Sequence, residues 1–203
     1  MALAEVTPEV TAPAEPELTA NWRRFGEQMA DADALVAPLS AEQLTWRPAP
    51  DRWSVADCLN HLNVTAEKYL PRIEQMVARG REEELESRGP FRHPFVGTWF
   101  VRMLEPPPRR RLRVPGVFAP LPGVEPAALL PEFLRLRTRL RNLVRDADGL
   151  DLARLKTSSP AARFFTLTLG QCFGALAAHD RRHLWQARQV ANHPDFPRQT
   201  SQS

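Results

Sequence analysis

Several features that define common protein classes are scarce in this chain of 203 residues. It has only two cysteines, Cys58 and Cys172, so we expect no disulfide framework and a reducing compartment. No apolar run approaches the roughly 20 residues that a membrane-spanning helix needs. Residues 1–16 have neither the basic region nor the apolar region of a secretory signal. The expectation is a cytoplasmic protein that does not work in a membrane.

Lysine is also rare, because Lys68 and Lys156 are the only two, and arginine supplies nearly all of the positive charge. The formal net charge of +3 is mild. The densest basic run, Arg109–Arg113, follows three prolines and has no interleaved aromatic residues. Such a run could contact nucleic acid, but a solvated loop explains it better. We therefore do not expect nucleic acid as a partner.

Alternating strand patterns and internal repeats are missing as well. Apolar residues instead recur at helical spacing in four long stretches, near residues 18–37, 54–79, 126–148 and 166–192. The third begins at Pro126 or Pro131, and its inner side carries Leu130, Phe133, Leu134, Arg137, Leu140 and Val144. In the second, Pro71 is expected to kink the helix. No convincing strand is predicted.

The fold prediction is therefore all-α: an up-down four-helix bundle with short extra helices. A long irregular connection, residues 91–123, joins the second and third long helices and includes a candidate short helix near Trp99. Because long loops are often functional, this connection could form a lid over a site. We expect one domain, residues 17–193. A flexible lead-in, residues 1–16, precedes it, and a polar tail, residues 194–203, follows it.

Two histidines stand where the apolar stripe of the last helix predicts core residues. His179 and His183 are one turn apart, so both imidazoles project from one face and could bind one metal ion. The intervening residues, Asp-Arg-Arg, exclude the HExxH motif of zinc proteases. His61, in the second helix, is the best candidate for a third ligand. His93 lies in a loop that could cover the site, and His193 is expected to be exposed.

Each histidine alone is more often a hydrogen-bonded core residue than a ligand. Together, however, two motifs carry a resemblance to a family. Trp53-Ser-Val-Ala-Asp57 followed by His61-Leu62, and later His179-Asp-Arg-Arg-His183-Leu-Trp-Gln186, resemble the motifs of the DinB-like (DinB/YfiT) superfamily. The likeness runs from about residue 18 to residue 192. It implies a four-helix bundle, frequent homodimers and a three-histidine metal site formed by His61, His179 and His183.

Family members with known activity include S-transferases and isomerases that depend on a thiol cofactor. The resemblance therefore implies a divalent metal ion and a low-molecular-weight thiol that attacks a small-molecule electrophile. Imidazole ligands suit zinc or nickel, while iron and manganese stay open. The alternative is a non-catalytic, metal-stabilised dimeric module for binding or stress response. In such a module a fourth protein ligand, His93 or Cys58, would close the site.

Neighbouring residues have two interpretations each. Asp57 could accept a hydrogen bond from His61, but the Ser-x-x-Asp spacing favours a helix cap. Asp180 could orient a ligand or pair with an arginine, and Gln186 is a candidate partner of His183. Cys58 and Cys172 could line a pocket, although small buried hydrophobic residues are the better interpretation.

Overall fold

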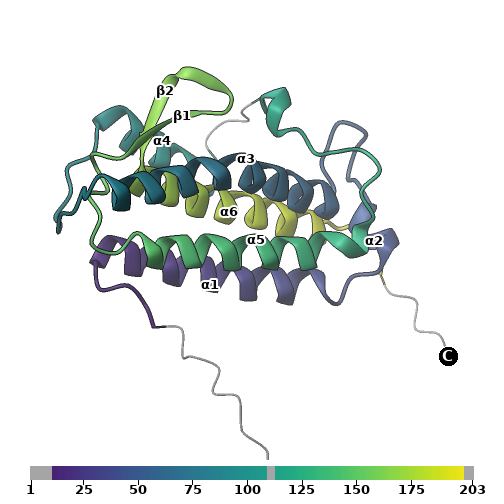
Figure 1. The fold of residues 1–203 in the computed structure, drawn as a ribbon. Helices are drawn as coiled ribbons and strands as arrows, with labels where there is room; N and C mark the ends of the chain where they lie inside the picture. Colours follow the sequence, from purple (N-terminus) through teal and green to yellow (C-terminus); the bar gives the residue numbers. More distant parts are fainter. Residues whose placement is uncertain (1–10, 109–112, 199–203) are drawn as a thin grey trace, which may run out of the picture.

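The computed structural model describes residues 11–108 and 113–198, and this part of the chain is predominantly helical (Figure 1). Residues 1–10, 109–112 and 199–203 lie outside the described residues, and with them most of the expected lead-in, half of the tail and four residues of the basic run. The long helices are α1 (Pro16–Val36), α3 (Val55–Glu82), α5 (Pro126–Asp146) and α6 (Leu169–Ala191). The short elements are α2 (Ala41–Thr45), α4 (Phe95–Leu104), the 3-10 helix η1 (Gly116–Phe118), β1 (Lys156–Ser159) and β2 (Ala162–Thr168).

The predicted start of α3 is confirmed in detail. The Asp57 amide donates to Ser54 Oγ at 3.0 Å, and the Ser54 amide donates to the Asp57 carboxylate at 2.8 Å. This reciprocal pair satisfies two of the amides that a helix start leaves without partners. The helix then continues through Pro71 as far as Glu82. Pro126, rather than Pro131, begins α5.

The four long helices lie side by side, but α3 and α5 run in the same direction (Figure 1). Asn63, early in α3, donates to the Leu129 carbonyl, early in α5. Arg81, at the end of α3, donates to the Asp146 carbonyl, at the end of α5. The expected up-down order is therefore wrong for this pair. Residues 83–125 return the chain to the end at which α3 began, which explains why this connection is long.

The prediction of no strands is also wrong, because β1 and β2 form a short antiparallel hairpin before α6. The apolar spacing predicts helix from Thr166, but α6 starts at Leu169. Thr168 caps α6, since its Oγ1 accepts a hydrogen bond from the backbone N–H of Gln171 at 3.2 Å. The run before the cap, Phe164–Thr168, is aromatic and β-branched, which favours extended backbone over helix.

A buried polar layer divides the core into two apolar clusters. One cluster gathers the ends of α1 and α6 with the starts of α3 and α5, and the other fills the opposite half. Between them lie the buried polar residues Gln28, His61, Asn63, Arg137, Asp180 and His183. Every long helix contributes to this layer, so the layer is the place where the fold brings functional groups together. None of the described helices is long and apolar enough to span a membrane.

Candidate metal centre

Three imidazoles converge in the polar layer. His61 comes from α3, His179 and His183 come from α6, and the candidate ligand atoms all lie within 4.8 Å of one another. The Nε2 atoms of His61 and His179 are 3.0 Å apart. Two nitrogens bound to one zinc ion at about 2.0–2.1 Å would be roughly 3.3 Å apart, so this spacing fits a shared ion. The cluster is compatible with a metal site.

Hydrogen bonds from the Nδ1 atoms orient two of the rings. His61 Nδ1 lies 2.6 Å from the carbonyl oxygen of Phe118, which can only accept, so this nitrogen carries the proton. His183 Nδ1 lies 3.1 Å from Gln186 Oε1 and donates to it in the same way. In both neutral rings Nε2 is then the atom with the lone pair. Carbonyl and amide acceptors of this kind fix the tautomer of metal-ligating histidines.

The third ring, His179, has no such support among the described residues. Its Nδ1 atom is buried and lacks a hydrogen-bond partner. His61 and His183 are buried as whole residues, whereas His179 is half-buried. Burying a polar nitrogen without a partner is unfavourable unless another interaction compensates. A bond from Nε2 to a metal ion would compensate for the unpaired Nδ1, although it would not give that atom a partner.

All three imidazoles are held neutral near pH 7. Burial lowers the pKa of His61 to about 4, although the bond to Phe118 opposes the shift, and burial lowers the pKa of His183 to about 3. The pKa of His179 is lowered as well, by burial first and then by the charge of its neighbours. A proton competes with a metal ion for the same lone pair. Lowered pKa values therefore keep the cluster ready for a cation at neutral pH.

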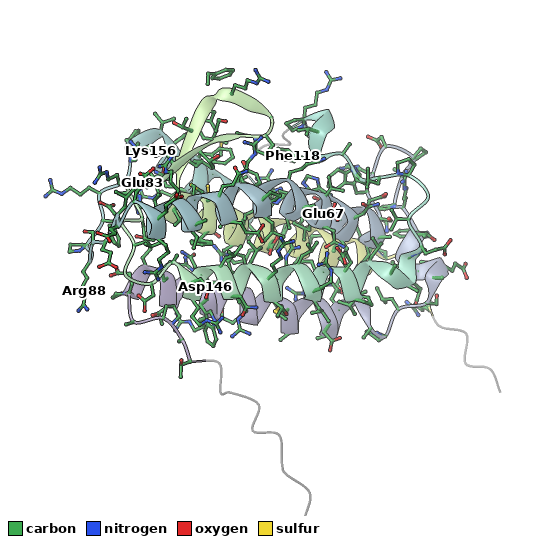
Figure 2. The ribbon with its side chains drawn as sticks, in the orientation of Figure 1. Glu67, Glu83, Arg88, Phe118, Asp146 and Lys156 are labelled. Carbon is green, nitrogen blue, oxygen red and sulfur yellow. The ribbon has the colours of Figure 1, made fainter. Side chains whose placement is uncertain are left out.

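Two aromatic residues, Trp53 and Phe118, contact the cluster. The Trp53 ring lies 4.9 Å from the His61 ring and 5.5 Å from the His183 ring, measured between centroids. Phe118 reaches the cluster from η1, which lies over α3 (Figure 2). Its ring stacks on Tyr69, two turns beyond His61 along α3, at 6.0 Å. The long connection therefore contacts the cluster through the Phe118 carbonyl. Trp99, which was expected to belong to a lid, is 54% exposed on α4.

The residues between His179 and His183 have structural partners. Asp180 pairs with Arg137 of α5, and both side chains are buried. Arg181 pairs with Glu105, just after α4. Asp180 thus pairs with an arginine, one of its two expected roles, whereas Asp57 caps α3 and pairs with Arg47. The Gln186 bond to His183 agrees with the expectation for that residue.

Neither candidate for a fourth ligand joins the group of ligand atoms. His93 bonds to Glu17 and Thr168, and Thr168 is about 16 Å from His179 along α6 by helix rise. Cys58 packs in the apolar cluster at the start of α3, and burial raises the pKa of its thiol. Cys172 is buried too, with its pKa raised to about 12. Both cysteines are the small hydrophobic residues that the sequence favoured.

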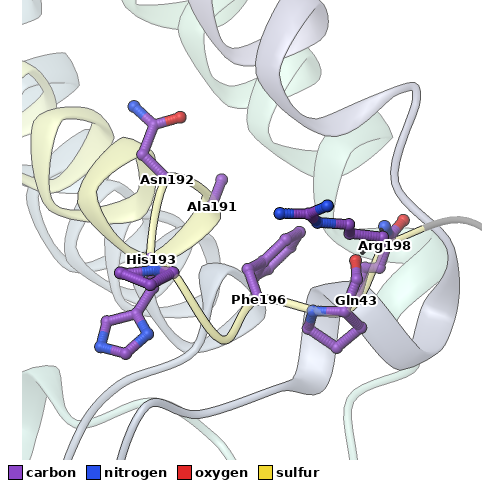
Figure 3. A pocket seen from close by; sticks show the side chains of 8 residues that line it. Gln43, Ala191, Asn192, His193, Phe196 and Arg198 are labelled. Atoms are coloured by element: carbon purple, nitrogen blue, oxygen red, sulfur yellow. Dashed lines mark hydrogen bonds between the residues drawn. The ribbon is translucent and has the colours of Figure 1, made fainter.

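Two surface pockets lie away from the three imidazoles. The larger pocket, about 520 Å³, is lined by the end of α6 and by the segment after it, which includes Phe196 and Arg198 (Figure 3). Gln43 of α2 also lines it. The smaller, about 190 Å³, lies where the loop after η1 meets α3 and is lined by Asn60 and Leu121, among others. Asn60 bonds to both backbone groups of Leu121 and so fastens this loop beside His61.

Sequence reasoning missed three parts of the site: the Phe118 carbonyl, the contacts of Trp53 and the role of Arg137. A backbone carbonyl leaves no signal in the residue type. Arg137 did leave one, because it is a charged residue on an apolar helix stripe.

Comparisons with known proteins agree with the geometry. No curated protein and no solved structure matches the chain. A family model described as the DinB superfamily matches residues 24–187, which include all three histidines of the cluster. The chain belongs to the DinB superfamily.

Proposed function

We propose that the chain binds one divalent metal ion through His61, His179 and His183 and catalyses transfer of a small thiol to an electrophile. The observation that carries the metal site is the convergence of three neutral imidazoles with no fourth ligand. Among the described residues, no other His, Cys, Asp or Glu joins the group. Three protein ligands and an open position are typical of catalytic rather than structural zinc sites. Zinc or nickel suits three imidazoles, and iron or manganese would be accepted less readily.

The chemistry follows from the open position. A divalent ion bound there lowers the pKa of a coordinated water or thiol to near or below neutrality. In the proposed reaction the thiol gives its proton to solvent, and its sulfur forms a bond to an electrophilic carbon. The leaving group departs with the electrons of the broken bond. The part that this chain plays is to orient the ligands through Phe118 and Gln186 and to keep the imidazoles neutral.

The non-catalytic module is the alternative, and the two hypotheses differ in the fourth ligand. A closed structural site would need His93 or Cys58, and both have other surroundings. This observation favours an enzyme. Thiol transfer itself rests on the family resemblance.

The first test is metal content by mass spectrometry, on protein purified without a histidine tag. We expect about one divalent ion per chain in the native protein and a near-complete loss in His61→Ala. The metal-loaded protein is then assayed with small thiols and alkylating electrophiles. Metal that is lost in His61→Ala, with no transfer to any electrophile, would leave the binding module as the function. Absence of metal even after reconstitution would contradict the whole proposal.

We also propose that the long helices form a bundle of the four-helix DinB/YfiT type and that two copies of the chain associate through α4. Phe95, Val96 and Trp99 share one face of α4 and are 79%, 61% and 54% exposed. Aromatic residues and arginine are enriched in protein interfaces, and Arg102 continues this face. Light scattering should show a dimer in the native protein and a monomer in Trp99→Glu. A native monomer at high concentration would contradict this.

A further inference from the structure

The buried ion pair Arg137–Asp180 crosses the centre of the protein. Nε and Nη2 of Arg137 donate to the two carboxylate oxygens of Asp180 at 2.9 and 2.5 Å, and each side chain is 1% exposed. Arg137 comes from α5 and Asp180 from α6. Burying two charges costs solvation that their attraction often fails to recover, so an apolar pair is commonly as stable. Stability alone is therefore a weak reason for this pair.

The same guanidinium also holds α3. Its Nη2 donates to the Leu62 carbonyl at 3.2 Å, and its Nη1 lies 3.5 Å from Asn63 Oδ1. Asn63 in turn donates to the Leu129 carbonyl of α5 at 3.0 Å. One side chain of α5 thus makes polar contacts with both helices that carry the histidines. The planar guanidinium has five donors in a fixed arrangement, which allows it to bridge two acceptors at a set distance.

The two acceptors occupy matching places in the sequence. Leu62 directly follows His61, and Asp180 directly follows His179. Within a helix, neighbouring residues move together because the backbone is hydrogen-bonded. Fixing Leu62 and Asp180 relative to one guanidinium therefore fixes the relative position of the two histidine backbones. Those are the histidines whose Nε2 atoms lie 3.0 Å apart.

We propose that Arg137 is a positioning residue for the metal ligands: it holds α3 and α6 at the separation at which the three imidazoles converge. The inference rests on the proposed metal site and adds to it the residue that sets its geometry. Metal ligands have to be held within about 0.5 Å of their productive positions, which packing of interchangeable apolar side chains does not specify. A guanidinium bonded to both helices does specify it.

The test compares zinc affinity with folding in Arg137→Met/Asp180→Leu. This double variant removes both charges, so neither is left buried alone, and we expect it to fold with a thermal midpoint near that of the native protein. Zinc affinity, measured by competition with a chromophoric chelator, should fall roughly tenfold or more. The absorption bands of bound Co²⁺ should also change. Unlike a purely structural role, a positioning role alters this spectrum.

A second variant keeps the test valid if the double variant does not fold. Arg137→Lys retains the charge but offers one compact ammonium, which cannot bridge Asp180 and Leu62 in the same way. We expect a smaller loss of zinc affinity in the same direction. The matched control is Arg139→Met/Glu74→Leu, which removes an exposed ion pair between the same helices α5 and α3. Its zinc affinity should equal that of the native protein.

The outcomes separate the two proposals. A folded double variant with native zinc affinity and a native Co²⁺ spectrum overturns the positioning role, while zinc loss in His61→Ala still supports the metal site. If only Arg137→Lys folds, native zinc affinity and a native Co²⁺ spectrum in that variant overturn the positioning role. A native protein that binds no zinc, or a His61→Ala variant that keeps it, overturns the metal site, and the positioning role fails with it.

Discussion

Two histidine sites lie along α6, one at its start and one in its middle. They differ in whether protein side chains satisfy all of the ring nitrogens. At the start of α6, His93 uses both ring nitrogens. Its Nδ1 lies 2.7 Å from the Thr168 hydroxyl, and its Nε2 lies 3.0 Å from each carboxylate oxygen of Glu17. Further along the helix, the three-histidine cluster turns its Nε2 atoms toward one another, and His179 Nδ1 has no partner among the described residues.

This difference teaches how to tell a structural histidine from a candidate ligand. The His93 site has a donor for every acceptor and a carboxylate for charge, so it needs no further component. In the three-histidine cluster, a proton on His179 Nε2 can bond to the lone pair of His61 Nε2, but His179 Nδ1 is then left buried without a partner. Burial also lowers the pKa values of the rings, so a further proton is not taken up near neutral pH. A cation completes such a site. Both sites contain histidine, but among the described residues only the three-histidine cluster leaves a ring nitrogen without a partner.

The largest expected effect separates the sites by metal content. His179→Ala should abolish binding of the divalent ion, because two remaining imidazoles hold it too weakly. His93→Ala should keep about one ion per chain but lower the free energy of unfolding by about 1–3 kcal/mol, since Thr168 and Glu17 lose their partner. Mass spectrometry and urea unfolding measure the two quantities. Metal loss in His93→Ala with His179→Ala unaffected would reverse the comparison.

The second prediction concerns pH and the metal-free protein. The pKa of His61 is about 4 and that of His183 about 3 in the folded chain, against about 6.5 when unfolded. Below pH 6.5 the unfolded state binds more protons, so stability is complete above pH 6.5 and is lost as the pH falls toward the folded values. With His179 included, the loss approaches roughly 4 kcal/mol per pH unit. Urea unfolding between pH 8 and pH 5 measures it.

A single substitution calibrates this slope. His183→Leu removes one of the three titrating groups, so the dependence on pH should become about one third shallower. A native profile that is flat between pH 7 and pH 5 would show that the imidazoles are not held neutral by burial.

The smallest expected effect tests how closely the His93 site is packed. In Gly170→Ala the new Cβ would lie 2.8 Å from His93 Cε1 and even closer to the Glu17 carboxylate. The new Cβ should push Glu17 and His93 apart, which should lower the free energy of unfolding by about 1–3 kcal/mol. Gly174→Ala is the control one turn along, where the nearest atom is 3.6 Å away and alanine should gain about 1 kcal/mol in helix propensity. Thermal midpoints that shift equally would contradict the packing, and metal content should not change.

Much of this arrangement could be predicted from local pattern. Apolar spacing located the long helices, and Ser54 with Asp57 located the start of α3. The i, i+4 spacing placed His179 and His183 on one face without any tertiary information. The prediction that His61 joins them rested on its position near the apolar stripe of the second long helix and on the family resemblance. The helix positions could be predicted because they depend on helix periodicity, which a sequence displays directly. That the three histidines bind a metal ion stays a prediction.

The remaining features depend on contacts between distant residues. The direction of α5 is set by the path of residues 83–125, and no pattern within α5 encodes it. The β1–β2 hairpin is short, and its register shifts at Ser159, so alternation is too brief to recognise. The Phe118 carbonyl is a backbone group, and Arg137 was visible only as a charge on an apolar stripe. Its partners Asp180 and Leu62 lie 43 and 75 residues away.

X-ray absorption spectroscopy of the zinc-loaded native protein tests the central claim most directly. The claim is that one ion is held by three imidazoles and keeps an open position. The spectrum should show only nitrogen or oxygen neighbours at about 2.0–2.1 Å, with outer scattering from three imidazoles and one further ligand from solvent. A sulfur neighbour at about 2.3 Å would place a cysteine in the site. That result, or a fourth imidazole, would contradict the account and make the site a closed structural one.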